Sequence, residues 1–517
     1  MATTATATAP KSTMQRILDV VEKVGNKVPH PAVIFLALIG VTIVLSQVLA
    51  WTGASVTYEV IDEATHQVKT VTTEAQSLLT RDGIRFIYSS LVPNFMGFGA
   101  VGLLITAVLG VGVAEESGLV KALIRKLVAI APPKSIAYIL IFIGILSSIA
   151  ADAGYLVLIP LAGAAFLSIG RHPLAGLAAG FAAVAGAFTV NMLIKPLDAV
   201  LTEFTNDAVR SVDPALQIGL TSNLWFSIAS VVMLTFVITF ITQRVIEPRL
   251  GKYTGEKPAD ENAGDAAAES RGLLFAGIAL GAVLVVFALL TLPSGAALRN
   301  PGPGPDAGSL IGNSPFMNGL IAFIATVFFA AGAAYGYGAG TFKKFNDIIK
   351  AVEKQLSALG GLILLLFIIA QFIAYFNYSN MATILAVNIA DILETANIGP
   401  FWLLLGFIIV VALLDLVITG AIAKWAIFAP VFVPILVRLG VDPEAVLAAY
   451  RVADSPFNSI TPLNAYFALV VTFAIKYDKN AGVGTIVALM LPYVIWTFIA
   501  WTALFFLWYF LGLPWGI

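Results

Sequence analysis

The 517-residue chain contains no cysteine, and Asp, Glu, Lys and Arg together make up only 11% of it. A typical soluble domain has about 25% charged residues. The absence of cysteine excludes disulfides, thiol chemistry and thiolate metal sites, and it argues against a haem or iron–sulfur protein. The three histidines, His30, His66 and His172, are scattered along the sequence. The residues that are missing therefore argue against most cofactor chemistry.

Apolar residues dominate instead: they form 59% of the chain, and the mean hydropathy is +0.93. Several segments reach the roughly 20 apolar residues that a bilayer-spanning helix needs. The composition predicts an all-α polytopic membrane protein whose surroundings are lipid, and no nucleic-acid partner is expected. Uninterrupted spans are predicted near residues 32–51, 98–114, 135–150, 225–243, 272–292, 315–334, 358–376 and 483–511.

The distribution of positive charge predicts the orientation. Lys and Arg cluster in residues 11–27, 121–134, 244–257 and 343–354. The positive-inside rule places these clusters and the N-terminus in the cytoplasm. The chain then divides into a cytoplasmic tail with an interfacial helix at 1–31, a first transmembrane half at 32–246, a cytoplasmic linker at 247–271 and a second transmembrane half at 272–517.

Two hydrophobic segments, 152–196 and 400–475, are interrupted by proline, glycine and polar residues. An odd number of crossings must separate cytoplasmic Lys134 from Trp225, which is predicted to lie outside. Residues 152–196 are too broken for simple spans, so we predict a re-entrant hairpin there.

The two interrupted segments are related to each other. Residues 152–191 align with 422–461 without gaps at an offset of 270, which pairs Pro160 with Pro430, Gly170 with Gly440, and Pro173 with Pro443. Because the copies start from opposite sides of the membrane, they form an inverted repeat, with a second hairpin near 415–440. Inverted repeats with broken helices are typical of secondary transporters, which bind cargo between the copies.

Charged residues within these apolar segments are candidates for the site. Arg451 and Asp454 are three residues apart and share a helix face. A buried charge in the membrane is costly, which favours a role in transport, although a structural ion pair within the helix would also explain them. Asp415, alone in an apolar run, is either an ion ligand or proton acceptor in a cavity or a cap at the hairpin entry. Asp198 follows Lys195 by three and is either functional or part of a surface pair at the membrane edge.

Neutral groups complete the candidate site. Trp425 could stack on an aromatic substrate or act as an interfacial anchor. The stretch "SPFNSITP" (455–462) offers hydroxyl and amide oxygens, and its prolines leave backbone carbonyls without donors. Carboxylate, amide and carbonyl oxygens suit a hard cation. We predict a Na⁺ site at Asp415, Asp454 and Asn458, with Na⁺ as a coupling ion and no other cofactor.

Four long motifs resemble the p-aminobenzoyl-glutamate transporter (AbgT) family: "VEKVGNKVPHP", "DAGYLVLIPLAGAAFLSIGRHPLAG", "AAYRVADSPFNSITP" and "GVGTIVALMLPY". The resemblance covers nearly the whole chain. It implies a homodimeric protein of the bacterial inner membrane with nine spans and two opposed re-entrant hairpins in each protomer. It also implies transport of p-aminobenzoyl-glutamate, an anionic aromatic compound, or efflux of sulfonamides, driven by a cation or proton gradient. The family's functional positions fall on Asp198, Trp425, Pro443, Arg451, Asp454 and Pro462.

Two residues depart from the family pattern. Ile422 stands where a small hydroxyl residue is usual, and Asp415 stands where relatives tend to have a neutral Asn near a sodium ion. Both departures bear on the substrate and on the coupling ion.

Three alternatives differ in function. A passive channel could use the same cavity without carboxylates placed for ion coupling. An intramembrane enzyme is disfavoured, because no H-E-x-x-H, G-x-S-x-G or P-loop motif occurs. The strongest rival is a Na⁺-coupled dicarboxylate transporter of similar architecture.

Overall fold

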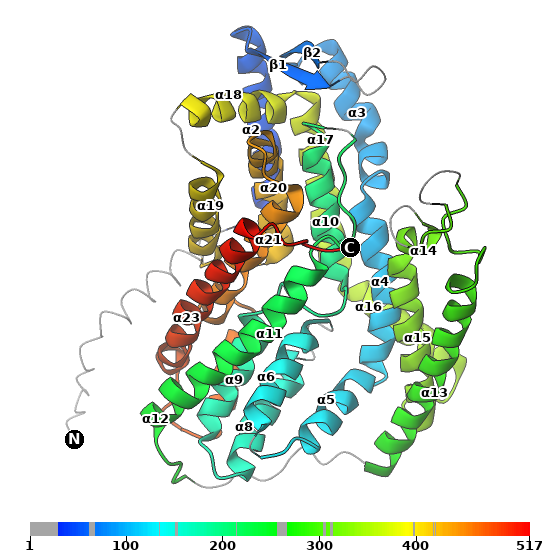
Figure 1. Ribbon diagram of the computed structural model, residues 1–517, viewed down its shortest axis with the longest axis vertical. Helices are drawn as coiled ribbons and strands as arrows, with labels where there is room; N and C mark the ends of the chain where they lie inside the picture. Colours follow the sequence, from blue (N-terminus) through cyan, green and yellow to red (C-terminus); the bar gives the residue numbers. More distant parts are fainter. Residues whose placement is uncertain are drawn as a thin grey trace, which may run out of the picture.

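Helices make up almost all of the regular structure (Figure 1). The computed structural model describes residues 29–61, 68–133, 135–149, 154–213, 215–255, 266–302, 307–310, 314–395, 399–416, 418 and 420–517. Within them, eight helical segments are long and apolar enough to cross a membrane: α2 (Pro31–Trp51), joined α3 (Arg81–Met96) and α4 (Gly99–Glu116), the run of α11 (Leu224–Ile241), η3 (Thr242–Ile246) and α12 (Glu247–Leu250), α13 (Ala266–Thr291), α15 (Leu320–Ala339), α17 (Gly360–Tyr378), α20 (Ala421–Arg438) and α23 (Val483–Phe510). The predicted all-α polytopic membrane fold is confirmed.

The shorter elements lie between these spans. They are α5 (Leu119–Ala129), α6 (Ile136–Leu146), η1 (Ser147–Ile149), η2 (Gly154–Leu158), α8 (Ile159–Ser168), α9 (Pro173–Ala185), α10 (Pro196–Val209), α14 (Pro315–Asn318), α16 (Phe345–Ala358), α18 (Met381–Thr395), α19 (Pro400–Asp415), α21 (Pro443–Asp454), η4 (Pro456–Ser459) and α22 (Phe467–Ile475). A two-stranded antiparallel ribbon, β1 (Ser55–Ile61) and β2 (Val68–Glu74), was not predicted. Val56 of this ribbon packs on Ile384 and Val387 of α18.

The interrupted segments fold as two structural repeats, each with one hairpin and one broken crossing. In the first repeat α6 and α8 are joined at residues 147–153, and α9 and α10 at 186–195. In the second repeat α19 and α20 are joined at 416–420, and α21 and α22 at 455–466. Helix by helix, these elements follow the 270-residue offset of the sequence alignment. Arms such as α6, with 11 residues, are about 16 Å long and cannot span the roughly 30 Å core of a bilayer.

The structure corrects the position of the first hairpin. The chain turns between α6 and α8, so residues 152–196 contain the second arm of the hairpin and the first half of the next crossing. Sequence alone missed this turn because the run 135–150 is apolar throughout, and hydropathy does not distinguish a hairpin arm from a full span. In the second repeat, the predicted segment 415–440 contains the turn and the arm α20.

The turn that joins the hairpin to the next helix, α8 to α9 and α20 to α21, is the same in both repeats. Gly170 follows α8 and Gly440 follows α20, with φ angles of 78° and 79°. Each helix end is closed by the same hydrogen bond, from Arg171 N to Phe166 O at 2.9 Å and from Val441 N to Leu436 O at 3.0 Å. Pro173 and Pro443 then begin α9 and α21, where a missing N–H costs nothing.

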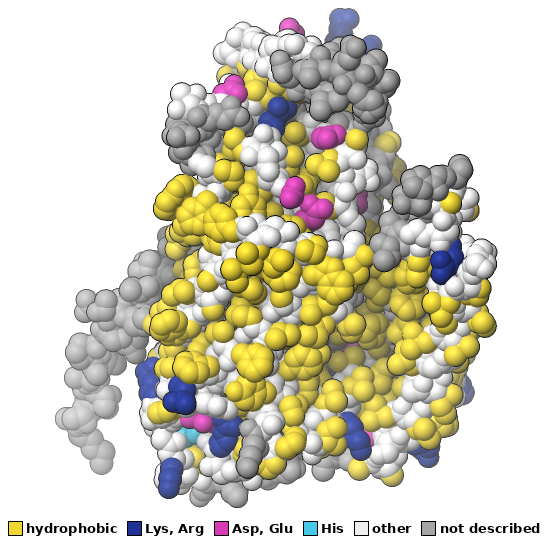
Figure 2. Space-filling model, in the orientation of Figure 1, with side chains coloured by type: hydrophobic (Ala, Val, Ile, Leu, Met, Phe, Trp, Pro, Cys, Tyr) yellow, Lys and Arg dark blue, Asp and Glu magenta, His cyan; other side chains and the backbone are white. Residues whose placement is uncertain are grey.

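The described basic residues of α5 and α12 lie toward the same end of the molecule (Figure 1). Arg125 of α5 pairs with Glu269 at the start of α13, and Lys354 of α16 lies 2.8 Å from Glu116 of α4. Figure 2 shows Lys and Arg side chains along the lower edge, below a broad hydrophobic band. The β ribbon and α18 lie at the opposite end (Figure 1). This separation agrees with the predicted topology, whose orientation stays a prediction, and the cluster at 11–27 lies outside the described residues.

The predicted domain boundaries also stay predictions. Of the tail at 1–31, the structure describes only residues 29–31. The proposed linker at 247–271 is described at 247–255 and 266–271, and α12 and the start of α13 lie within it.

We expect Gly440→Ala to destabilise the protein through its backbone. The left-handed conformation costs about 1–2 kcal/mol for a residue with a Cβ, and no atom lies within 4 Å of the added methyl group. Thermal unfolding in detergent should occur at a lower temperature. The control Gly277→Ala, in the open surroundings of helix α13, should leave the melting temperature unchanged or raise it. A Gly440→Ala protein as stable as the wild type would contradict this account.

Candidate functional site

The helix breaks of the two repeats meet inside the protein. Thr189, in the break between α9 and α10, receives a hydrogen bond at its carbonyl from Arg451 Nη1 at 2.7 Å. Its hydroxyl donates to the carbonyl of Arg451 at 2.9 Å, and its N–H donates to Ser455 Oγ at 3.0 Å. Polar backbone freed by one broken helix is thus satisfied by the other, as a water-poor interior requires.

Arg451 pairs with Asp198 and not with Asp454, its neighbour on α21. Its Nη1 lies 2.6 Å from Asp198 Oδ1, and its Nε donates to Asn223 Oδ1 at 3.0 Å. Only 3% of the Arg451 side chain is exposed. The backbone N–H of Lys195 donates to Asp198 Oδ2 at 2.8 Å, so both carboxylate oxygens are occupied. The alternative of an ion pair within one helix is therefore wrong for Arg451.

Lys195 places a third charge beside this pair. Its buried ammonium donates to the carbonyl of Phe188 and to Ser148 Oγ, the latter at 3.2 Å. Ser148 belongs to η1 at the first hairpin turn, so Lys195 ties that turn to the break that follows α9. Asp152, a further carboxylate in this apolar part of the sequence, lies outside the described residues.

A second charge cluster joins the two arms of the second hairpin to α21. We call Asp415, Lys424 and Asp454 the acidic trio. Lys424 Nζ forms ion pairs with Asp415 Oδ1 and, at 2.7 Å, with Asp454 Oδ1. All three side chains have 0% exposure. With two carboxylates and one ammonium, the acidic trio carries a net charge of −1.

Asp454 is further held by neutral groups. The Tyr450 hydroxyl lies 3.1 Å from Asp454 Oδ1 and 2.5 Å from the carbonyl of Ala421, so its single proton is shared between two acceptors. Asn458 Nδ2 lies 3.1 Å from the backbone carbonyl of Asp454 and 3.4 Å from its Oδ2. Two of the three predicted Na⁺ ligands are therefore adjacent, and Lys424 separates them from the third, Asp415.

Trp425 is completely buried and serves the packing of the hairpin in this conformation. Its ring stacks on Tyr450 with centroids 4.5 Å apart, and its Nε1 donates to the carbonyl of Leu201 and to Thr205 Oγ1, each at 3.1 Å. It thus joins α20 to α10 of the other repeat. It is not an interfacial anchor, and stacking on a substrate would require the ring to become accessible.

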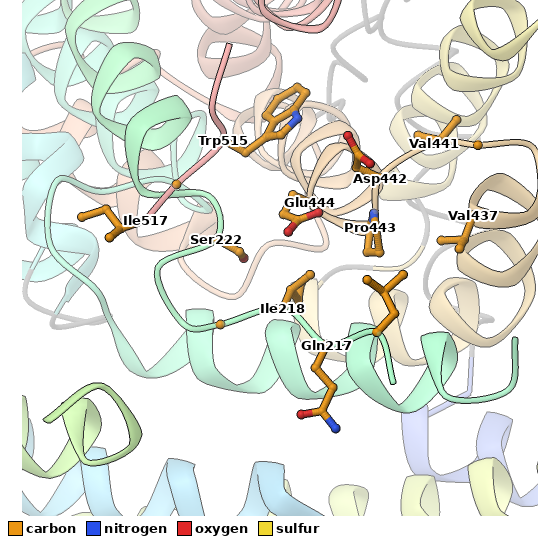
Figure 3. Close-up of a pocket in the computed structure, with 14 residues that line it drawn as sticks. Gln217, Ile218, Ser222, Val437, Val441, Asp442, Pro443, Glu444, Trp515 and Ile517 are labelled. Carbon is orange, nitrogen blue, oxygen red and sulfur yellow. The ribbon is translucent and has the colours of Figure 1, made fainter. Parts of the chain in front are cut away.

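Pro443 lies apart from the buried charges, at a cavity of about 610 Å³. Asp442, Glu444 and Trp515 also line this cavity (Figure 3). Asn223 connects it with the site, because its Nδ2 donates to the carbonyl of Glu444 at 3.0 Å while its Oδ1 accepts from Arg451. The space beside Asp198 and Arg451 is only about 10 Å³, room for about one water molecule.

The structure therefore gathers most of the predicted residues around two charge clusters. Pro462 lies in the break between α21 and α22, where Thr461 Oγ1 donates to the carbonyl of Leu416 at 3.0 Å and so ties this break to the second hairpin turn. Lys424 and Asn223 were missed by the sequence analysis. Lys424 could have been found, because a lysine within an apolar hairpin arm is unusual. Asn223 could not, because an asparagine at the boundary of a predicted span is ordinary.

The resemblance found in the sequence was tested against known families. A profile of the AbgT putative transporter family matches residues 16–517. The chain belongs to the AbgT family. Among its relatives, the p-aminobenzoyl-glutamate transport protein of Escherichia coli (strain K12) is 33% identical over 497 residues, which cover 96% of this chain and 95% of the relative. The family is one of transporters and not of enzymes.

Two solved structures of AbgT-type transporters share the fold. The YdaH transporter of Alcanivorax borkumensis, described as having an unusual topology, is 40% identical, with a TM-score of 0.87 over 95% of this chain and 100% of that one. MtrF of Neisseria gonorrhoeae, described as illuminating a class of antimetabolite efflux pumps, is 36% identical. Its TM-score is 0.88, and the match covers 95% of this chain and 97% of MtrF.

We expect the buried Arg451–Asp198 pair to be energetically coupled. Arg451→Ala or Asp198→Ala alone leaves a buried charge without its partner, which costs about 3–5 kcal/mol. The double variant should lose clearly less than the sum of the two losses, as measured by thermal unfolding in detergent. Removing the exposed Arg85–Asp82 pair, whose side chains are 76% and 79% exposed, should change the stability by less than about 1 kcal/mol. Additive losses at Arg451 and Asp198 would show that the pair is not coupled.

Proposed function

We propose that this protein is a secondary active transporter of p-aminobenzoyl-glutamate or a related aromatic, folate-type compound, including sulfonamides, and that transport is coupled to Na⁺ or H⁺. The observation that carries the proposal is the contact between the two helix breaks at Thr189 and Arg451, beside the buried Arg451–Asp198 pair and, three residues further along α21, Asp454 of the acidic trio. An arrangement of this kind can bind an anion and a cation together at the interface of two inverted repeats.

The substrate class is supported by the relatives and by the charges. One relative is named as a p-aminobenzoyl-glutamate transport protein, and another belongs to a class of antimetabolite efflux pumps. Arg451 provides a planar guanidinium that suits a carboxylate. It would bind the substrate by exchanging one of its present partners, Asp198 or Asn223, for the anionic group.

Transport requires this closed arrangement to open. The roughly 10 Å³ beside Arg451 cannot hold an aromatic compound, so the described conformation is a closed one. Movement of the hairpin arm α20 away from α10 would uncover Trp425, which could then pack on the aromatic ring of the substrate. The chain would bend at Pro443, which begins α21, and at Pro462, which lies between α21 and α22.

The surroundings of the protein follow from the same proposal. We infer that it resides in the bacterial inner membrane with a cytoplasmic N-terminus, because the basic residues of α5 and α12 lie toward the same end of the molecule (Figure 1). A homodimer is proposed from the family resemblance.

Uptake by purified protein in liposomes tests the function. With an imposed Na⁺ or H⁺ gradient, labelled p-aminobenzoyl-glutamate should accumulate above its external concentration. Arg451→Ala and Asp454→Ala should each reduce the rate roughly ten- to hundredfold, because each removes a charged contact.

Three outcomes would contradict the proposal. Wild-type rates in both variants would remove the assigned roles of Arg451 and Asp454. Downhill flux alone under every gradient would favour a channel. Competition by succinate, without competition by unlabelled p-aminobenzoyl-glutamate, would favour a dicarboxylate transporter.

A further inference from the structure

Lys424 occupies the place in which the sequence predicted a sodium ion. It lies between Asp415 and Asp454, within 2.7 Å of the second, and it is completely buried. Neither the family resemblance nor the functional candidates included this residue. One of the protein's own side chains thus lies where the coupling ion was predicted to bind.

The placement of the two carboxylates in the fold favours a cation between them. Asp415 is the last residue of α19, and Asp454 is the last residue of α21. A helix C-terminus carries a partial negative charge and free carbonyl groups, both of which attract cations. In addition, Asp415 Oδ2 is buried and has no hydrogen-bond partner among the described residues. A buried carboxylate oxygen without a hydrogen-bond partner is stabilised when a cation binds to it.

Lys424, by contrast, is poorly placed for a permanent cation. It lies in the first turn of α20, where the helix N-terminus carries a partial positive charge and disfavours an ammonium group. Within the described part of the chain, Lys424 Nζ has no neutral hydrogen-bond acceptor, so the two ion pairs alone hold it. The flexible stem of lysine allows the ammonium to leave while the helix stays in position.

We propose that Lys424 is a tethered cation that closes a monovalent-cation site between Asp415 and Asp454, and that it leaves this site when the coupling ion binds. Exchange of the Lys424 ammonium for one monovalent cation replaces one positive charge with another, so the two carboxylates keep a single cation between them. The proposal deepens the transport function above, because it assigns the ion-coupling step to one residue.

Displacement of Lys424 also provides coupling to the substrate. Once a cation takes its place, the ammonium is a buried charge without a carboxylate partner, which is unfavourable until an anion binds nearby. Binding of the cation therefore strengthens binding of an anionic substrate, and by linkage the substrate strengthens binding of the cation to the same degree.

Binding of Na⁺ alone, without any organic substrate, tests this inference. Purified protein in detergent is titrated with radioactive Na⁺ at alkaline pH, where protons compete little for the carboxylates. Lys424→Met should bind Na⁺ about tenfold more tightly than the wild type or better, because the competing charge is gone. Lys424→Arg keeps a positive charge and should show no gain.

A matched double variant separates charge competition from other effects. Asp415→Asn/Lys424→Met restores the net charge of −1, and its affinity for Na⁺ should return to within a few-fold of the wild type. Should Lys424→Met fail to fold, Lys424→Gln replaces it, and Asp415→Asn is compared with the double variant, which should bind Na⁺ more tightly.

The inference is overturned if loss of the Lys424 charge leaves the affinity for Na⁺ unchanged or weaker, or if the gain persists in the double variant. Failure of p-aminobenzoyl-glutamate transport in liposomes, together with the expected Na⁺ affinities, would reject only the proposed substrate.

Discussion

The structure depends on the satisfaction of polar groups at two hairpin turns and two helix breaks within the membrane. Each break frees backbone N–H and C=O groups in a region that offers no water, so partners must come from the protein. The break at Thr189 and the helix end at Arg451 exchange hydrogen bonds in both directions, which fixes the two repeats against each other. Buried charges then become tolerable, because Arg451 and Asp198 pair at this junction and each has further hydrogen-bond partners.

The repeat is symmetric in backbone and asymmetric in chemistry. Gly170 and Gly440 adopt the same left-handed conformation, and prolines begin the same helices. The side chains differ: Arg451 and Asp454 correspond to buried Phe181 and Val184 in the first repeat. Lys424 corresponds to Gly154, where a Cβ atom would approach Ser147 Oγ to 2.4 Å. One copy thus provides close packing where the other provides charge, and this division confines the acidic trio to the second repeat.

Asn223 links the closed site to the cavity beside Pro443. Asn223 contacts Arg451 on one side and the first turn of α21, beside the cavity of about 610 Å³, on the other. Movement of α21 that altered this cavity would therefore disturb the contacts of Arg451. In the same way, Trp425 joins the hairpin arm α20 to α10, so that a movement separating the two helices would also expose its ring.

Much of the architecture was determined by the sequence itself. Apolar runs, basic clusters and the 270-residue offset of the Pro–Gly–Pro frame predicted the spans and the repeat, because hydropathy and the conformational limits of proline and glycine act locally. Candidate residues could likewise be found, since a charge in an apolar segment is conspicuous. Only the tertiary structure decided their partners. Arg451 meets Asp198, 253 residues away, and not Asp454, which lies three residues along its own helix. Lys424 lies between the predicted cation ligands because the turn of the second hairpin brings the end of α19 against the start of α20. Pairing of buried charges depends on which helix breaks come together, and that is a property of packing between distant segments.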